Sequence, residues 1–301
     1  MLNAETLLTL LSRHADALGR PVQEFSLGGR VFDFNRRRAL MGVINLSADS
    51  AYRESVCTTP EAAIARGRTL QEQGADWVDL GAESSLPDAR RVTPGEQIDL
   101  LVPVVKALAR EGAVVSAESY YPEVLEAAAL AGARVFNLTG AREEKDAWKL
   151  AARHDTAVIH CHVQGETVRD VGDFALHGDM TEEWINQFRE RIRRAEALGV
   201  RKHIVDPGLG FYYANLTDGE ERINHQISTF LNAFRLAALG WPILNILPHA
   251  PEVFGESHRR SAEPFFAVLA LLGGSHILRT HEVDTVARIR RIMEGYREPA
   301  P

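Results

Sequence analysis

The chain has 301 residues, of which 45% are hydrophobic and 25% charged, and its formal net charge at pH 7 is -7. This composition can bury a large core and excludes a disordered or collagen-like protein. The negative charge argues against a nucleic-acid partner, because binding to a phosphate backbone needs clustered cations.

Cysteine usage and hydropathy narrow the class of protein further. Cys57 and Cys161 are too few for a disulfide framework, so we expect a reducing, cytoplasmic location. No apolar run reaches the ~18 to 20 residues needed to cross a bilayer. Residues 1–11 show no basic leader segment, so we expect neither an export signal nor a membrane partner.

Residues 1–38 are predicted to form an extension ahead of the main domain, which spans residues 39–301. Leucines at helical spacing predict a helix over residues 5–18. Residues 24–35 are predicted to form a hairpin with Gly28 and Gly29 at its turn. We expect both pieces to close the bottom of the main domain.

Eight short apolar runs follow, separated by segments with helical periodicity. They are residues 39–45, 76–83, 113–118, 134–138, 157–162, 203–206, 242–245 and 276–281. Five of the intervening helices end in glycine, at Gly74, Gly132, Gly199, Gly240 and Gly274. Apolar strands that alternate with helices predict an α/β protein with an all-parallel sheet, closed as a (β/α)8 TIM barrel. A doubly wound open sheet is the alternative, but no G-x-G-x-x-G follows Ile44.

Polar side chains stand at the end of nearly every predicted strand, where a barrel enzyme carries its chemistry. They are Asn45, Glu83, Ser84, Ser85, Glu118, Asn137, His160, His162, Asp206, Asn245, Arg279 and His281. Desolvating so many polar groups on one rim is costly unless they bind a ligand or one another. The set therefore predicts a binding site, although any single member is also explained by a hydrogen bond to a neighbour.

Two pairs of these residues share a strand face, because they lie two positions apart. Arg279 and His281 together predict a clamp for an oxyanion or a diphosphate. The alternative for Arg279 is an ion pair with a neighbouring carboxylate. His160 and His162 have the spacing of metal ligands, but without a third ligand motif we favour packing or substrate contact over zinc.

Four segments resemble the signatures of the dihydropteroate synthase family. They are residues 41–50 (MGVINLSADS), 81–87 (GAESSLP), 206–211 (DPGLGF) and 279–281 (RTH), in an order and spacing that match the family from about residue 25 onward. The resemblance implies a pterin-binding barrel and a transferase of folate biosynthesis. Such an enzyme joins 6-hydroxymethyl-dihydropterin diphosphate to p-aminobenzoate and releases diphosphate with the help of Mg²⁺.

The resemblance also implies a role for individual residues. Asn45 matches an asparagine that binds magnesium and diphosphate, and Arg279 with His281 matches the diphosphate clamp. Asp206 matches an acid that reads the amino group and ring nitrogen of the pterin, and Asn137 matches an amide at its other edge. We predict Asn45, Asp206, Arg279 and His281 as catalytic residues, and Glu118, Asn137, Asp206, Ser85 and Asn245 as substrate-binding residues.

The chain also departs from the family pattern. Glu118 stands where the family has aspartate, and Leu86 and Leu138 replace an arginine and an aspartate. Residues 245–251 (NILPHAP) lack the lysine expected to hold the pterin carbonyl, and residues 51–54 (AYRE) replace a segment that covers the aminobenzoate.

We therefore interpret the chain as a divergent member that acts on a pterin-type diphosphate and an amine acceptor. One alternative is a catalytically silent or repurposed pterin-binding paralogue. Another is a pterin-dependent methyl-transfer protein, which would not need a diphosphate clamp. Since barrels of this family tend to form dimers through helices near the chain end, residues 262–272 are predicted to supply a homodimer face or else core.

Overall fold

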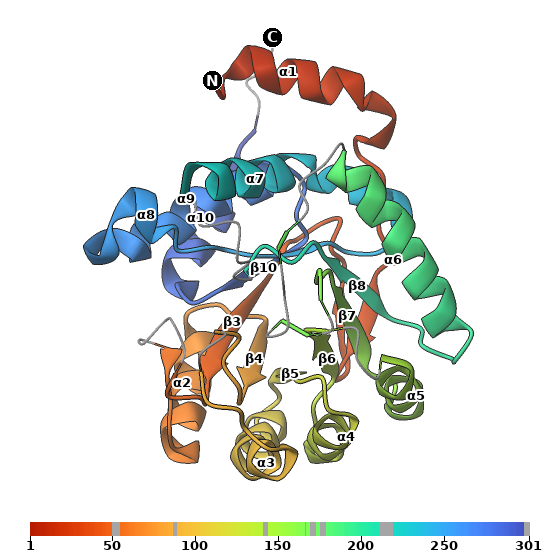
Figure 1. Cartoon of the computed structure of the whole chain (residues 1–301), viewed down its shortest axis with the longest axis vertical. Helices are drawn as coiled ribbons and strands as arrows, with labels where there is room; N and C mark the ends of the chain where they lie inside the picture. The colour runs from red at the N-terminus through yellow and green to blue at the C-terminus, as the bar shows by residue number, and fades with distance from the viewer. Residues whose placement is uncertain are drawn as a thin grey trace.

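The computed structural model describes residues 1–49, 55–86, 89–140, 144–165, 167–168, 173–174, 179–210 and 219–297. In this part of the chain, eight parallel strands form a ring that is surrounded by helices (Figure 1), in the order β8-β7-β6-β5-β4-β3-β10-β9. A parallel bridge between Val205 and Ile243 brings the two outermost strands together. The sheet is thus a nearly closed barrel, and the predicted TIM-barrel fold is confirmed.

The strands of the barrel overlap the eight predicted runs. They are β3 (Ala39–Asn45), β4 (Trp77–Gly81), β5 (Val114–Glu118), β6 (Val135–Leu138), β7 (Ala157–Cys161), β8 (His203–Asp206), β9 (Leu244–Ile246) and β10 (Ile277–Thr280). Strand β9 ends one residue later than predicted. In its register with β10, Leu244 lies beside Ile277 and Ile246 beside Arg279.

Helices connect the strands on the outside of the ring. They are α2 (Pro60–Glu72), α3 (Pro94–Arg110), α4 (Pro122–Ala131), α5 (Glu144–His154), α6 (Met180–Glu196), α7 (Gly219–Asn232), α8 (Pro251–Phe254), α9 (Ala262–Leu272) and α10 (Val283–Gly295), with 3-10 turns η1 (Ala15–Ala17), η3 (Ala233–Leu239) and η4 (Glu256–Ser261). Helix α3 begins with a capping box in which Thr93 and Glu96 each bond the backbone N–H of the other. None of the helices among the described residues is long and apolar enough to span a membrane.

Glycine ends helix α4 for two physical reasons. Gly132 has a φ of 123°, which favours glycine, and a Cβ there would lie 2.6 Å from the Cβ of Ala109. The chain can therefore turn from α4 into β6 while α4 packs closely on α3.

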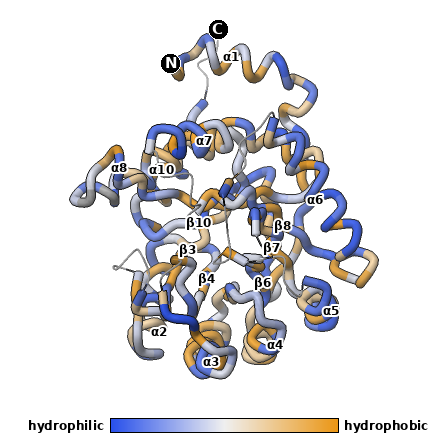
Figure 2. The backbone as a smooth tube through the Cα atoms, viewed as in Figure 1, coloured by the Kyte–Doolittle hydropathy of each residue, from blue (hydrophilic) through white to orange (hydrophobic). Residues whose placement is uncertain are grey.

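Alternation along the strands divides the side chains between the inside and the outside of the barrel. The inward residues of the lower half are apolar, among them Met41, Trp77, Val114, Ile204 and Ile277. Figure 2 shows hydrophobic residues along the barrel strands and mixed faces on the surrounding helices. The same inward positions become polar toward the C-terminal ends of the strands, and this change creates the site.

The predicted hairpin is confirmed and closes the bottom of the barrel. Strands β1 (Phe25–Leu27) and β2 (Arg30–Phe32) are joined by Gly28 and Gly29, both with positive φ. The ring of Phe32 lies 5.3 Å from that of Trp77, and the ring of Phe34 lies 6.1 Å from it. These contacts join the hairpin to the apolar interior.

Helix α1 (Ala4–Arg13) does not close the barrel, which corrects our expectation for it. It lies outside the ring of strands (Figure 1), where Leu7 and Leu10 pack against a cluster that contains Ile223 and Leu231 of α7. A leucine stripe predicts that a helix is covered on one side but not which surface covers it.

Candidate active site

The C-terminal ends of the strands enclose a cavity of about 140 Å³. Its strand-borne lining comprises Asn45, Glu118, Asn137, Cys161, Asp206, Ile246 and Arg279, with His281 directly after β10. Loops add Glu83 to Leu86, Thr139, Gly208 to Gly210 and Leu247 to Ala250, and helices α7 and α8 add Arg222, Gln226 and Pro251. Of the predicted catalytic and substrate-binding residues, all but Asn245 therefore lie around one cavity.

Arg279 is held deep in this cavity by carboxylates from two strands. Its Nε donates to Asp79 Oδ2 at 2.8 Å and its Nη2 donates to Glu118 Oε2 at 2.6 Å. Asn137 Nδ2 donates to the same oxygen of Asp79 at 3.2 Å. The alternative interpretation of Arg279 as an ion-paired arginine thus holds in this structure, and the pairing fixes the guanidinium at the base of the site.

The polar residues at the strand ends do not include Asp79, because Asp79 lies in the middle of β4. Its side chain is fully buried. The available signal was an acid at an inward position of an otherwise apolar run, since such a residue needs a partner inside the barrel.

The buried carboxylates of the cavity hold protons unusually well. Burial raises the pKa of Glu118 to about 7; Arg279 opposes this shift, while Asp79 and Asp206 add to it. Burial likewise raises the pKa of Asp206 to about 6, opposed by the Gly208 N–H, which donates to Asp206 Oδ1 at 2.8 Å. Glu118 and Asp206 therefore titrate close to neutral pH.

His281 lines the cavity as a neutral ring. Burial, followed by the neighbouring His249 and Arg279, lowers the pKa of His281 well below its usual range. A neutral imidazole can donate one hydrogen bond but brings no charge. The positive charge of the expected clamp thus comes from Arg279.

Asn45 and Ser85 line the cavity, from β3 and from the loop after β4. Asn45 Nδ2 donates to Ser55 Oγ at 2.6 Å, which fixes the amide. Leu86 follows Ser85 and gives this side an apolar wall. The segment 50–54, residue 87 and Phe211, which belong to or adjoin the family signatures, lie outside the described residues.

Asn245 does not face the cavity, so its predicted contact with substrate is corrected. Its Nδ2 donates to Ser275 Oγ at 2.8 Å, and the side chain is fully buried. Because Leu244 and Ile246 are in register with the inward Ile277 and Arg279 of β10, they are the inward positions of β9, and Asn245 between them points outward. Ile246 lines the cavity instead.

His160 and His162 point to the outer side of the sheet, in agreement with packing rather than with zinc or substrate contact. His160 Nε2 lies 3.0 Å from His203 Nδ1, and the ring of His162 lies 5.8 Å from that of Trp184. Cys161 between them faces the cavity, where burial raises the pKa of its thiol. The sequence analysis considered Cys161 only for a disulfide or a zinc site, although strand alternation places it opposite to both histidines.

The loop after β9, where the family lysine is missing, supplies different chemistry. His249 lines the cavity, and its Nε2 lies 3.0 Å from Glu263 Oε1 of α9. Ala250 adopts the left-handed conformation, with φ 41°, which is strained for a residue with a Cβ. Sequence reasoning did not pair His249 with Glu263, because they lie on separate elements.

Comparisons with known proteins agree with this geometry. The family described as "Pterin binding enzyme" matches residues 41–281. The chain is 28% identical over 265 residues to a dihydropteroate synthase of Escherichia coli K12, covering 85% of this chain and 90% of that protein. It is 27% identical over 282 residues to a dihydropteroate synthase of Synechocystis, covering 89% of this chain and 93% of that protein.

Solved structures of dihydropteroate synthases have the same fold. The enzyme of Xanthomonas albilineans with 4-aminobenzoic acid has a TM-score of 0.76 and 28% identity, covering 91% of this chain and 98% of that chain. The enzyme of Thermus thermophilus in complex with 6HMPPP has a TM-score of 0.71 and 28% identity, covering 91% of this chain and 99% of that chain. These relatives support the synthase interpretation over the alternatives of a silent paralogue and a methyl-transfer protein. Because this family matches most of its length, the chain belongs to the pterin-binding enzymes.

Proposed function

We propose that this chain is a transferase of the dihydropteroate synthase type, which joins an amine such as p-aminobenzoate to a pterin carried as its diphosphate. The amine nitrogen bonds to the carbon attached to the pterin ring, the bond from that carbon to the diphosphate oxygen breaks, and the amine loses a proton. One observation carries the proposal: the ring-side acceptors Asp206 and Asn137 line the same cavity as Arg279 and His281.

Asp206 and Asn137 bind and orient the pterin ring in this proposal. Above a pH of about 6, the Asp206 carboxylate is ionised and accepts hydrogen bonds from an amino group and a ring N–H side by side. The Asn137 amide is oriented by its bond to Asp79. Both groups are therefore fixed before the ligand arrives.

Arg279 stabilises the negative charge that develops as the diphosphate leaves. A guanidinium fixed in a buried cavity does so without rearranging solvent. Glu118 competes for its Nη2, but burial raises the pKa of this carboxyl, and its protonation would weaken the ion pair with the guanidinium. Neutral His281 can donate a further hydrogen bond to the leaving group.

Mg²⁺ fits the donor set at Asn45 as an ion that arrives with the diphosphate. Asn45 offers a hard amide oxygen in the lining of the cavity, and Mg²⁺ in phosphate sites takes few protein ligands beside phosphate oxygens and water. Bound there, the ion would neutralise charge on the leaving group.

The proposal is tested by incubating the purified protein with 6-hydroxymethyl-dihydropterin diphosphate, Mg²⁺ and p-aminobenzoate. We expect diphosphate release in equal amount to a coupled product of the mass of dihydropteroate. Arg279→Ala should slow both by ~100-fold or more, since it removes a preorganised charge. Asp284→Asn, on the exposed α10 surface, serves as the matched control. Pterin binding without release would contradict the proposal and favour a silent or repurposed paralogue.

A homodimer and a cytoplasmic location belong to the same proposal. Phe265 and Leu272 lie one heptad apart on α9 and are 43% and 55% exposed, while Ile292 of the neighbouring α10 is 70% exposed. Exposed apolar side chains on one face favour a protein contact, whereas Phe266 and Leu269 of α9 belong to the core. The free, buried thiols of Cys57 and Cys161 are in keeping with a reducing compartment.

A further inference from the structure

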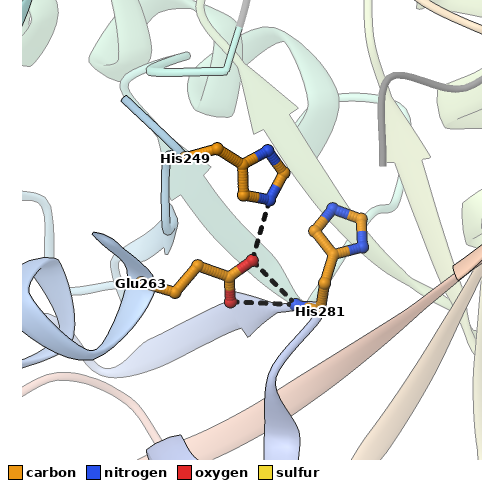
Figure 3. Close-up of side chains that lie close together, drawn as sticks. All are labelled: His249, Glu263 and His281. Carbon is orange, nitrogen blue, oxygen red and sulfur yellow. Dashed lines mark hydrogen bonds and ion pairs between the residues drawn. The ribbon is translucent and has the colours of Figure 1, made fainter. Parts of the chain in front are cut away.

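His249, Glu263 and His281 form a cluster at the edge of the cavity (Figure 3). They come from the loop after β9, the first turn of α9 and the residue after β10. One nitrogen or oxygen atom of each side chain lies within 4.8 Å of those of the other two. Within the described residues, no other three histidine, cysteine or acidic side chains meet in this way.

The spacing of the cluster is close to that of ligands around one ion. His249 Nε2 and Glu263 Oε1 are 3.0 Å apart, and the two imidazole rings lie side by side with centroids 5.1 Å apart (Figure 3). Two ligands at ~2.1 Å from a metal are roughly 3 to 3.4 Å apart. The first pair already has this separation, and the ligand atom of His281, which lies within 4.8 Å of the other two, would come closer by rotation of its side chain to complete the set.

Glu263 is held in place as metal-binding carboxylates usually are. It is fully buried and accepts hydrogen bonds from the Thr280 hydroxyl, from the backbone N–H of His281 at 3.0 Å and from that of Glu282 at 3.2 Å. Outer partners of this kind orient a ligand and are part of a metal site. On the other side, the left-handed Ala250 turns the chain directly after His249.

The cluster is open on one side. His249 and His281 line the cavity, whereas Glu263 lies behind them. An ion bound by all three would thus keep a coordination position that faces the cavity. Three protein ligands with one open position distinguish catalytic from structural zinc sites.

We propose that His249, Glu263 and His281 bind a divalent transition metal of the zinc class, with its open position available to an oxygen atom of a ligand in the cavity. Two imidazoles and one carboxylate suit zinc and its neighbours in the first transition row, whereas Mg²⁺ prefers oxygen donors alone. This site is therefore different in place and chemistry from the magnesium position at Asn45. Zinc binding itself does not require the proposed transferase function.

The test uses untagged full-length protein, stripped with a chelator and titrated with Zn²⁺ by calorimetry and with Co²⁺ by visible absorption. We expect one ion per chain and a Co²⁺ spectrum of low coordination number. Since loss of an outer partner alone weakens a metal site by about 10- to 100-fold, His249→Gln and His281→Asn should each weaken binding by ~100-fold or more. His258→Asn, at an exposed histidine on η4, is the matched control.

Two results would overturn the proposal. In the first, the wild type binds Zn²⁺ no more tightly than His249→Gln does. His249 would then not be a metal ligand, and its contact with Glu263 would be a hydrogen bond alone. The other is an equal loss in His258→Asn, which would place the ion on the surface. Circular dichroism checks that each variant is folded. If His249→Gln does not fold, His281→Asn still tests the proposal at a second ligand. Mg²⁺ should neither compete for the site nor give the same variant pattern.

Discussion

The guanidinium of Arg279 is approached by two carboxylates from neighbouring strands, Asp79 from β4 and Glu118 from β5. Asp79 also holds Asn137, so one buried carboxylate orients both a cationic and an amide side chain of the cavity. Burying these charges costs free energy, and their ion pairs and hydrogen bonds offset this cost only while each charge keeps its partners.

Asp79→Asn should therefore lower the free energy of unfolding by about 3 to 5 kcal/mol, since it leaves Arg279 buried with a weaker partner. The matched control is Asp284→Asn, which removes one half of an exposed pair with Arg288 and should cost about 0 to 1 kcal/mol. Urea unfolding of both variants and the wild type measures the difference. Equal losses would mean that the buried network does not stabilise the site.

The pKa of Asp206 predicts how pterin binding depends on pH. The ionised carboxylate is the form that accepts two hydrogen bonds from the ring, and its pKa is raised to about 6. The ionised fraction rises about tenfold between pH 5 and pH 7, so the affinity for the pterin should rise by about that factor and level off above pH 7. Calorimetric titrations across this range are the check, and an affinity that falls as the pH rises would rule out Asp206 as the acceptor.

Among the elements, the hairpin of β1 and β2 covers the lower end of the barrel and shields its apolar interior from water. Phe32 and Phe34 cover Trp77 and the interior below the site. Without them, the inward residues of the strands would face water. The hairpin is thus part of the barrel core although it precedes the barrel in the sequence.

Phe32→Ala should destabilise the protein by about 3 to 5 kcal/mol, because it removes a buried ring and leaves a cavity against Trp77. Its neighbour Val31 is 66% exposed, so Val31→Ala provides a control of small effect. Thermal and urea unfolding report both changes. If the two variants were equally stable, the hairpin would not be part of the core.

Strand positions were predictable from the sequence, whereas the direction of individual side chains was less so. Apolar runs bounded by glycines located β3 to β10, because parallel strands in a barrel are buried on both faces. Asn245 was expected to point inward as the last residue of its run, but the register of β9 with β10 makes Ile246 the inward residue. Alternation along one strand does not report its register with the next strand, so this direction was not predictable.

For the whole molecule, the buried acids predict a dependence of stability on pH. The pKa values of Glu118 and Asp206 in the folded protein, about 7 and about 6, lie above their ordinary values of 4.5 and 3.8. The folded state thus binds protons more tightly than the unfolded state. The resulting stabilisation is fully present below about pH 4 and is lost as the pH rises through 6 and 7.

Asp206→Asn removes one of these groups, so its stability should fall less steeply than that of the wild type between pH 4 and pH 7. Urea unfolding midpoints of the two proteins at several pH values give the comparison. Other titrating groups affect both proteins alike, which leaves Asp206 as the source of any difference. Identical slopes would show that Asp206 titrates in the folded protein as it does in water.

The sequence predicted the barrel and most of the strand-borne lining of the cavity, since strand ends in a barrel converge whatever their separation along the chain. It did not predict the pairing of Arg279 with Asp79 or of His249 with Glu263. These pairs depend on side-chain reach across elements, which periodicity does not report.

The most direct measurement is a calorimetric titration of the wild type, Asp206→Asn and Asp284→Asn with 6-hydroxymethyl-dihydropterin diphosphate and Mg²⁺ at pH 8. The account predicts saturable binding of one ligand per chain by the wild type and the Asp284 variant. Loss of hydrogen bonds to a charged acceptor should weaken binding by Asp206→Asn about 10- to 100-fold. No binding by the wild type, or equal binding by Asp206→Asn, would contradict the claim that this cavity recognises a pterin.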